Sequence, residues 1–154
     1  MVGGASMTAR NDEAVYALEG EFAGHCQHST ATKAQLESLA IEVCTYYGRD
    51  VPHIRFVNSR RVLLSAWYDH EIVLNRSREG ANGMALLHEL AHYLVDEFYT
   101  GVEHHGPEYV AIYMHLLDRW KYLPNGCFRM LARKHRLKIG RRYRPTAFTR
   151  PSSR

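Results

Sequence analysis

The chain has 154 residues, of which 45% are hydrophobic and 23% are charged. This is the composition of an ordinary globular protein, and the length suits one hydrophobic core but not two full domains. No apolar run is long enough to cross a bilayer, and residues 1–7 lack the features of a secretory signal, so we expect no membrane partner. The three cysteines are odd in number and scattered, which argues against a disulfide framework and favours a reducing, cytoplasmic compartment.

Charge is distributed unevenly along the chain. Residues 1–118 contain 8 Lys and Arg and all 16 Asp and Glu, whereas residues 119–154 contain 12 Lys and Arg and no acid. A basic segment of this kind can anchor nucleic acid through phosphate contacts, although it can equally be a solvated terminus or fold back on the acidic body. We expect a single domain over residues 1–140 and a basic, flexible tail over residues 141–154.

The first half of the sequence predicts two helices followed by three strands. Thr30 or Thr32 is suited to cap the second helix, because a hydroxyl can accept a bond from the free backbone N–H groups of a first turn. With further helices downstream, this order indicates an α+β fold in which a small sheet packs on helices. Helices are expected at residues 14–24, about 30–47, about 84–98, from 107 onward and at 127 to about 134, and strands at 53–57, 62–67 and 70–74.

The motif HELAH at residues 88–92 suggests both a metal site and a reaction. On a helix, His88 and His92 leave the same face one turn apart, so both imidazoles can hold one Zn²⁺. Glu89 stands beside the first ligand, where its carboxylate can take a proton from a water molecule on the metal. The alternative is a core helix whose histidines bind nothing, but three polar groups on a buried stripe are costly without a metal to satisfy them.

A zinc site of this kind needs a third protein ligand. The metzincin arrangement is excluded, because Val95 and Phe98 occupy the positions of its glycine and third histidine. His105 is favoured because Pro107 begins a predicted helix, and a ligand at this junction would be held rigidly yet could point back at the first helix. The competing ligands are His104, Glu103 and Glu108.

The pairing of HELAH with HGPEY at residues 105–109 resembles the SprT-like zincins, in which HExxH is followed by a His-Gly-x-x-aromatic signature. The chain is most similar to a group of small uncharacterised HExxH metallohydrolases of actinobacteria and their phages, chiefly over residues 62–120. The resemblance implies a minimal zincin-like domain, with His88, His92 and His105 as zinc ligands, Glu89 as catalytic acid/base and Tyr109 as a structural aromatic. Better-known members often carry a separate DNA-binding module, but this chain has no Cys-x-x-Cys pair.

These features together predict a zinc metallopeptidase that hydrolyses a protein or peptide substrate, with Glu89 as general base. The alternatives are a nucleic-acid-associated zinc scaffold or regulator, and a metal-dependent nuclease or amidase. An extended peptide could add to the free edge of one predicted strand. Asp96 could orient His92, or could equally be a solvated acid. Three tyrosines are equal candidates for stabilising negative charge on the substrate: Tyr68, Tyr99 and Tyr109.

Overall fold

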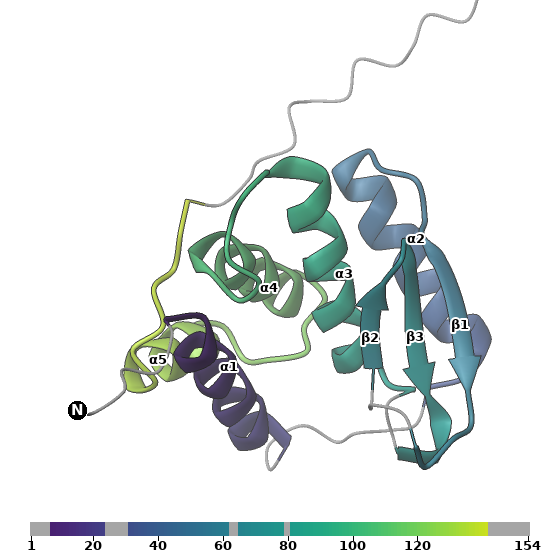
Figure 1. Cartoon of the computed structure of the whole chain (residues 1–154), viewed down its shortest axis with the longest axis horizontal. Coiled ribbons are helices and arrows are strands. Elements are labelled where there is room, and N and C mark those ends of the chain that lie inside the picture. Colours follow the sequence, from purple (N-terminus) through teal and green to yellow (C-terminus); the bar gives the residue numbers. More distant parts are fainter. Residues whose placement is uncertain (1–6, 24–30, 62–64, 79–80, 142–154) are drawn as a thin grey trace, which may run out of the picture.

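The computed structural model describes residues 7–23, 31–61, 65–78 and 81–141 (Figure 1). Over these ranges the chain forms five α-helices and a mixed three-stranded sheet, which confirms the expected α+β fold. None of these helices combines the length and the apolar composition that a membrane span requires. The elements are α1 (Met7–Ala23), α2 (Lys33–Tyr47), β1 (His53–Val57), β2 (Ser65–Tyr68), β3 (Glu71–Asn75), the short 3₁₀ helix η1 (Arg76–Arg78), α3 (Gly83–Phe98), α4 (Pro107–Arg119) and α5 (Cys127–Lys134).

The sheet has the strand order β1–β3–β2, so the last strand in the sequence is the central one. β1 runs parallel to β3, and β2 runs antiparallel to it. Asp69 and His70 join β2 to β3 with φ angles of +50° and +62°. Such left-handed values at both positions are typical of two-residue hairpin turns. The outer edge of β2 pairs with no other strand in the described ranges.

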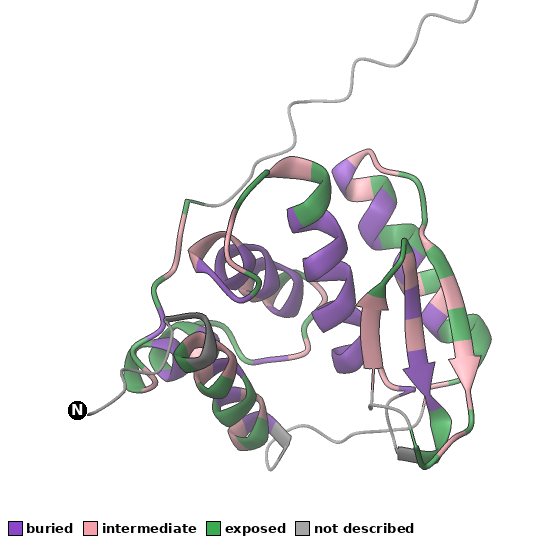
Figure 2. Cartoon of the chain, viewed as in Figure 1, coloured by how far each residue is buried: buried purple, intermediate pink, exposed green. Residues whose placement is uncertain are grey.

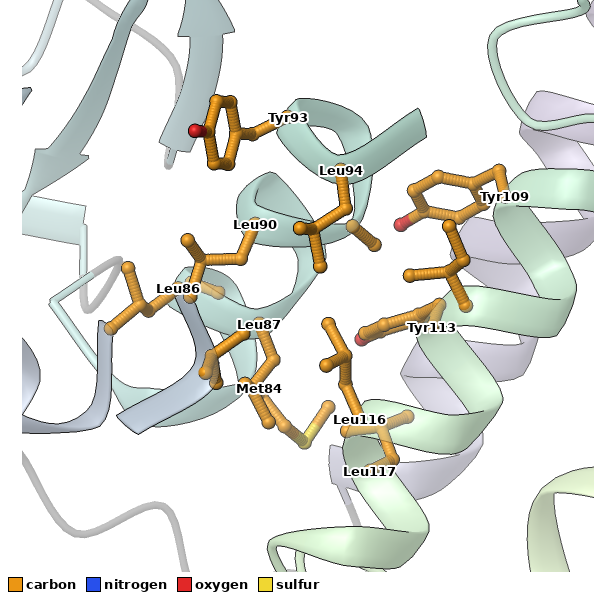
Figure 3. Packing of buried hydrophobic residues seen from close by; sticks show 14 of the residues in the cluster. Met84, Leu86, Leu87, Leu90, Tyr93, Leu94, Tyr109, Tyr113, Leu116 and Leu117 are labelled. Carbon is orange, nitrogen blue, oxygen red and sulfur yellow. The ribbon is translucent and has the colours of Figure 1, made fainter. Parts of the chain in front are cut away.

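Helix α3 lies between the sheet on one side and α4 on the other (Figure 1). Every residue of α3 from Gly83 to Val95 is buried, which is expected of a helix covered on several sides (Figure 2). On the side that faces α4, Leu94 points into the space where Tyr113 and Leu116 lie (Figure 3). The metal motif therefore sits on the most enclosed helix of the protein.

Local signals set the ends of the helices that carry the site. The Thr32 hydroxyl accepts a bond from the backbone N–H of Gln35, and the Gln35 side chain accepts one from the backbone N–H of Thr32. This capping box confirms Thr32, not Thr30, as the cap of α2. Asn82 caps α3 through the backbone N–H of Ala85, and Pro107 occupies the first turn of α4 as predicted.

Most predicted boundaries are confirmed, and the differences have local causes. The predicted strand 53–57 and helix 127–134 match β1 and α5. The first helix begins at Met7 instead of residue 14. Its first turns carry mostly polar residues, so no apolar stripe in the sequence marks them as helical. β3 starts at Glu71 instead of residue 70, because His70 belongs to the turn, and β2 and β3 each end one residue later than predicted. Residues 62–64 of the second predicted strand, and the tail from residue 142, lie outside the described residues.

Candidate metal centre

Three histidine side chains converge where α3 passes the start of α4. His88 and His92 extend from neighbouring turns of α3, and His105 lies two residues before α4. Their Nε2 atoms form a nearly equilateral triangle with sides of 3.2 Å between His88 and His92, 3.1 Å between His92 and His105, and 3.3 Å between His88 and His105. All three side chains are buried. The three residues predicted as ligands therefore come together in one place.

The triangle has the dimensions of a tetrahedral metal site. With metal–nitrogen bonds of about 2.0–2.1 Å, two ligand atoms of such a site lie roughly 3.3 Å apart. Nδ1 of both His88 and His105 faces a carboxylate oxygen, which assigns the ring proton to Nδ1 and leaves a lone pair on Nε2. Lone pairs that face one another at this distance repel unless a proton or a metal cation lies among them. Three neutral imidazoles are donors that suit zinc.

Helix α1 supplies the carboxylates that orient two of these imidazoles. Glu19 Oε1 accepts a hydrogen bond from His88 Nδ1 at 2.6 Å and another from the Tyr113 hydroxyl at 2.7 Å. Asp12 Oδ1 accepts a bond from His105 Nδ1 at 2.6 Å. Such pairs fix the tautomer and the orientation of a ligand histidine and raise its basicity. Helix α1 thus orients two of the three candidate ligands through hydrogen bonds to their Nδ1 atoms.

The sequence pattern did not single out Asp12 or Glu19. With Tyr16 they follow a four-plus-three spacing, which places all three on one face of a helix. That spacing was the available signal, but it does not reveal what the face packs against. His88 lies 69 residues after Glu19, and His105 lies 93 residues after Asp12, so only the tertiary structure brings these carboxylates to the candidate ligands.

Glu89 is buried beside the first ligand, and β2 holds its carboxylate. Ser65 Oγ donates a hydrogen bond to Glu89 Oε1 at 2.6 Å, and the backbone N–H of Trp67 donates another to this carboxylate. Burial raises the pKa of Glu89 above its ordinary value, although His88 and the two hydrogen bonds act in the opposite direction. A raised pKa moves the carboxylate toward the range in which it can exchange protons efficiently near neutral pH.

Burial also controls the charge of the candidate ligands. It lowers the pKa of His92, and it lowers the pKa of His105 to about 4. Both rings are therefore neutral near pH 7, which is the form that binds a metal. Burial acts the same way on His88, but the Glu19 carboxylate outweighs it and raises the pKa of that ring. Of the three, His88 is the ligand for which protons compete most strongly with a metal.

His104, the competing third ligand, lies outside the triangle of nitrogen atoms. Its side chain is exposed, and its ring stacks on that of His92 with centroids 3.9 Å apart. His105 is instead almost fully buried, and its Nε2 points at the other two ligands. The geometry agrees with the preference for His105 that the helix junction suggested.

The acidic residues considered from sequence have other partners or positions. Asp96 accepts a hydrogen bond from Trp67 Nε1 at 2.6 Å, and its side chain is exposed. Glu103 accepts a bond from Asn11 Nδ2 at 2.9 Å. Glu108 lies in the first turn of α4, where the helix dipole favours an acid. The described residues that gather as a compact buried donor set are the three histidines alone.

The three tyrosines considered from sequence occupy different environments. Tyr109 is fully buried, and its ring stacks on His92 with centroids 4.3 Å apart, as a structural aromatic would. Tyr68 is 73% exposed at the end of β2. Tyr99 is the C-cap residue of α3. Of these, Tyr109 touches the candidate ligands but has no exposure to a substrate.

No protein-family model, curated protein or solved structure matches the chain. The resemblance to the SprT-like zincins therefore stays a hypothesis, and function is inferred from the geometry of the site itself.

Proposed function

We propose that this chain is a zinc-dependent metallohydrolase, and specifically a metallopeptidase of the SprT-like zincin type, in which His88, His92 and His105 hold Zn²⁺ and Glu89 is the general base. One observation carries the proposal: three converging Nε2 atoms meet beside a buried carboxylate that two hydrogen bonds hold in place. Structural zinc sites usually have four protein ligands, whereas catalytic sites keep one position open. Within the described residues this cluster offers three.

The residues around the cluster have clear roles in hydrolysis. A bound Zn²⁺ supplies Lewis acidity, which makes a water molecule acidic enough to act as a nucleophile near neutral pH and polarises a substrate carbonyl. Glu89 accepts a proton from the attacking water and delivers it to the leaving amine. Ser65 and the backbone N–H of Trp67 keep that carboxylate in position. Asp12 and Glu19 hold two imidazoles in the tautomer that leaves Nε2 free to bind.

The surroundings of Glu89 favour a peptide as substrate. β2 is an edge strand that contacts α3, and an edge strand can pair with an extended peptide through backbone hydrogen bonds. The backbone N–H of Trp67 bonds the Glu89 carboxylate, so this outer edge of β2 faces the general base. A peptide that added to β2 would therefore run past Glu89, with its amide groups close to the candidate metal site.

The test compares two glutamates of the same helix. Glu89→Gln keeps the side-chain shape but cannot accept the proton, so we expect it to retain zinc while hydrolysis falls by about 100-fold or more. Hydrolysis is measured on heat-denatured lysate proteins, as new peptide termini detected by mass spectrometry. Glu97→Gln is the matched control, because Glu97 is exposed on α3 and its 3.4 Å ion pair with Arg49 contributes little. A wild-type protein that binds no zinc, or a Glu89→Gln variant that cleaves as well as wild type, contradicts the proposal.

A second candidate function, nucleic-acid binding, is supported by a basic surface on and after α5. The segment returns toward the candidate metal site, where the backbone N–H of Gly140 donates to the carbonyl oxygen of Pro107 at 2.8 Å. No acidic residue follows Asp118 in the sequence, and of the residues of this surface Lys134 pairs with Glu21 of α1 at 2.9 Å. Exposed cations of this density attract the phosphates of nucleic acid. The basic surface consists of Arg129, Arg133, Lys134, Arg136, Lys138 and Arg141.

Nucleic-acid binding through the basic surface can be tested by truncating the chain after Arg136 or by replacing its charged side chains, and charge substitution is the cleaner test. Leu137 is buried and Gly140 is bonded to α4, so truncation would remove packing along with charge. We expect substitution of three basic-surface residues by glutamine to weaken DNA binding and to reduce the salt dependence of the binding constant, measured at about 50 and 200 mM salt. Equal affinity of both triple variants and wild type at low salt contradicts nucleic-acid binding through this surface. The test variant replaces Arg133, Lys138 and Arg141, and the control replaces Lys33, Arg61 and Arg76, which lie exposed elsewhere.

A further inference from the structure

Tyr16 is an exposed aromatic residue that lies against two of the candidate ligands. Its side chain is 57% exposed, although its ring stands near that of His88 at 6.1 Å between centroids and with 11° between the planes. The same ring meets His105 edge-on, with centroids 5.5 Å apart. Tyr16 thus belongs to the site on one side and faces solvent on the other, which is where a substrate must approach.

The position of Tyr16 on α1 is held by its neighbours on the same helical face. Asp12 lies one turn before it and is bonded to His105, and Glu19 lies one turn after it and is bonded to His88. The backbone on both sides of Tyr16 is therefore tied to the candidate ligands. A side chain on such a support has a well-defined orientation toward the site.

The other tyrosines near the cluster cannot reach a substrate in this way. Tyr109 is fully buried, so a substrate has no access to its hydroxyl. Tyr113 is also fully buried, and its hydroxyl already donates to Glu19 at 2.7 Å. Tyr16, by contrast, combines ring contact with the candidate ligands and exposure to solvent.

We infer that the Tyr16 hydroxyl donates a hydrogen bond to the carbonyl oxygen of the scissile bond as that oxygen gains negative charge. This inference rests on the proposed hydrolytic function and adds a residue to it. A phenol O–H is a hydrogen-bond donor at neutral pH, and a fixed donor aimed at developing charge is the usual means of stabilising an oxyanion. The bond strengthens as the charge grows, so it lowers the barrier without requiring any change of covalent bonding in the tyrosine.

The experiment measures how the zinc-loaded protein binds acetohydroxamic acid, whose carbonyl oxygen is a substitute for the substrate oxygen. Tyr16→Phe keeps the ring contacts with His88 and His105 and removes only the hydroxyl. We expect its affinity for acetohydroxamic acid, measured by calorimetry, to fall about 10- to 150-fold, in line with one lost hydrogen bond to a charged group. Its affinity for zinc should remain that of wild type. Tyr46→Phe is the matched control, because the Tyr46 ring packs against Trp120 and Arg119 and has no role in the proposed site, and it should bind both as wild type does.

Turnover of a cleaved peptide gives a second measurement. Loss of the hydroxyl should lower kcat more than it changes KM, since the bond forms fully only as charge develops. Equal hydroxamate affinity and equal kcat in Tyr16→Phe and wild type would overturn the role of the hydroxyl. Failure of the wild-type protein to bind zinc or acetohydroxamic acid would instead overturn the proposed function on which the inference rests.

Discussion

The carboxylate of Glu19 accepts a hydrogen bond from Nδ1 of His88 at 2.6 Å, across 69 positions of the sequence. The same oxygen accepts a bond from the Tyr113 hydroxyl at 2.7 Å, so α1, α3 and α4 meet at a single atom. Burial opposes the charge of this carboxylate, but His88 and Tyr113 outweigh burial and lower the pKa of Glu19. The orientation of the first candidate ligand therefore depends on a helix that lies far from the HELAH motif in the chain.

Replacing Glu19 with glutamine should weaken zinc binding while leaving all three histidines in place. The amide is a weaker acceptor and carries no charge, so the His88 ring loses the partner that sets its tautomer, and we expect zinc affinity to fall about 10- to 100-fold. Competition with a chromogenic chelator measures this affinity. Glu13→Gln, an exposed position on the same helix, is the control and should bind zinc as wild type does. Equal affinity in the two variants would mean that Glu19 does not support the ligand.

The third ligand is tested by two adjacent substitutions. His105→Ala removes one corner of the nitrogen triangle and should lose most of the bound zinc, measured by elemental analysis after dialysis. His104→Ala removes an exposed ring that only stacks on His92, so it should keep its zinc. If both variants keep zinc equally, the three-histidine assignment is wrong, and Glu103 or Glu108 becomes the third ligand.

Removal of the metal should lower the thermal stability of the protein. A ligand that binds only the folded state stabilises it by about 2.7 kcal/mol when its free concentration is 100 times Kd. In a domain of this size each kcal/mol corresponds to roughly 2–4 °C, so we expect EDTA to lower Tm by about 5–10 °C. Differential scanning calorimetry with and without EDTA measures the shift. The His92→Ala variant should show no such shift, and a comparable shift in that variant would mean that the chelator acts elsewhere.

Gly140 is required where the C-terminal segment approaches the start of α4. A Cβ atom at this position would lie 2.8 Å from the backbone carbon and oxygen of Pro107, which cannot move away as a flexible side chain could. We expect Gly140→Ala to lower the free energy of unfolding by about 1–3 kcal/mol, measured by urea denaturation. Gly20→Ala is the control, because no atom lies near its Cβ position and alanine is the better helix former, so it should be neutral or stabilising. A Gly140→Ala protein as stable as wild type would show that the segment does not pack closely on α4.

The local parts of the fold could be predicted because they depend on short-range rules. The capping box at Thr32 and the proline start of α4 involve only neighbouring residues, and both are present in the structure. The early turns of α1 were missed because Asp12 and its neighbours face a polar site, so the helix lacks the apolar period that marks a buried face. The start of β3 was placed one residue too early because His70 adopts a left-handed turn conformation that non-glycine residues rarely take.

The sequence by itself determined that His88 and His92 leave one face of a helix with Glu89 beside them, because a helix of 3.6 residues per turn places them there wherever it packs. Only the tertiary structure decided what completes this group of residues. His105 reaches the triangle because α4 packs against α3, and α1 joins them through the hydrogen bonds of Glu19 to His88 and of Asp12 to His105. Contacts of this kind depend on which faces of separate helices and strands pack together. No local pattern in a single sequence indicates that packing.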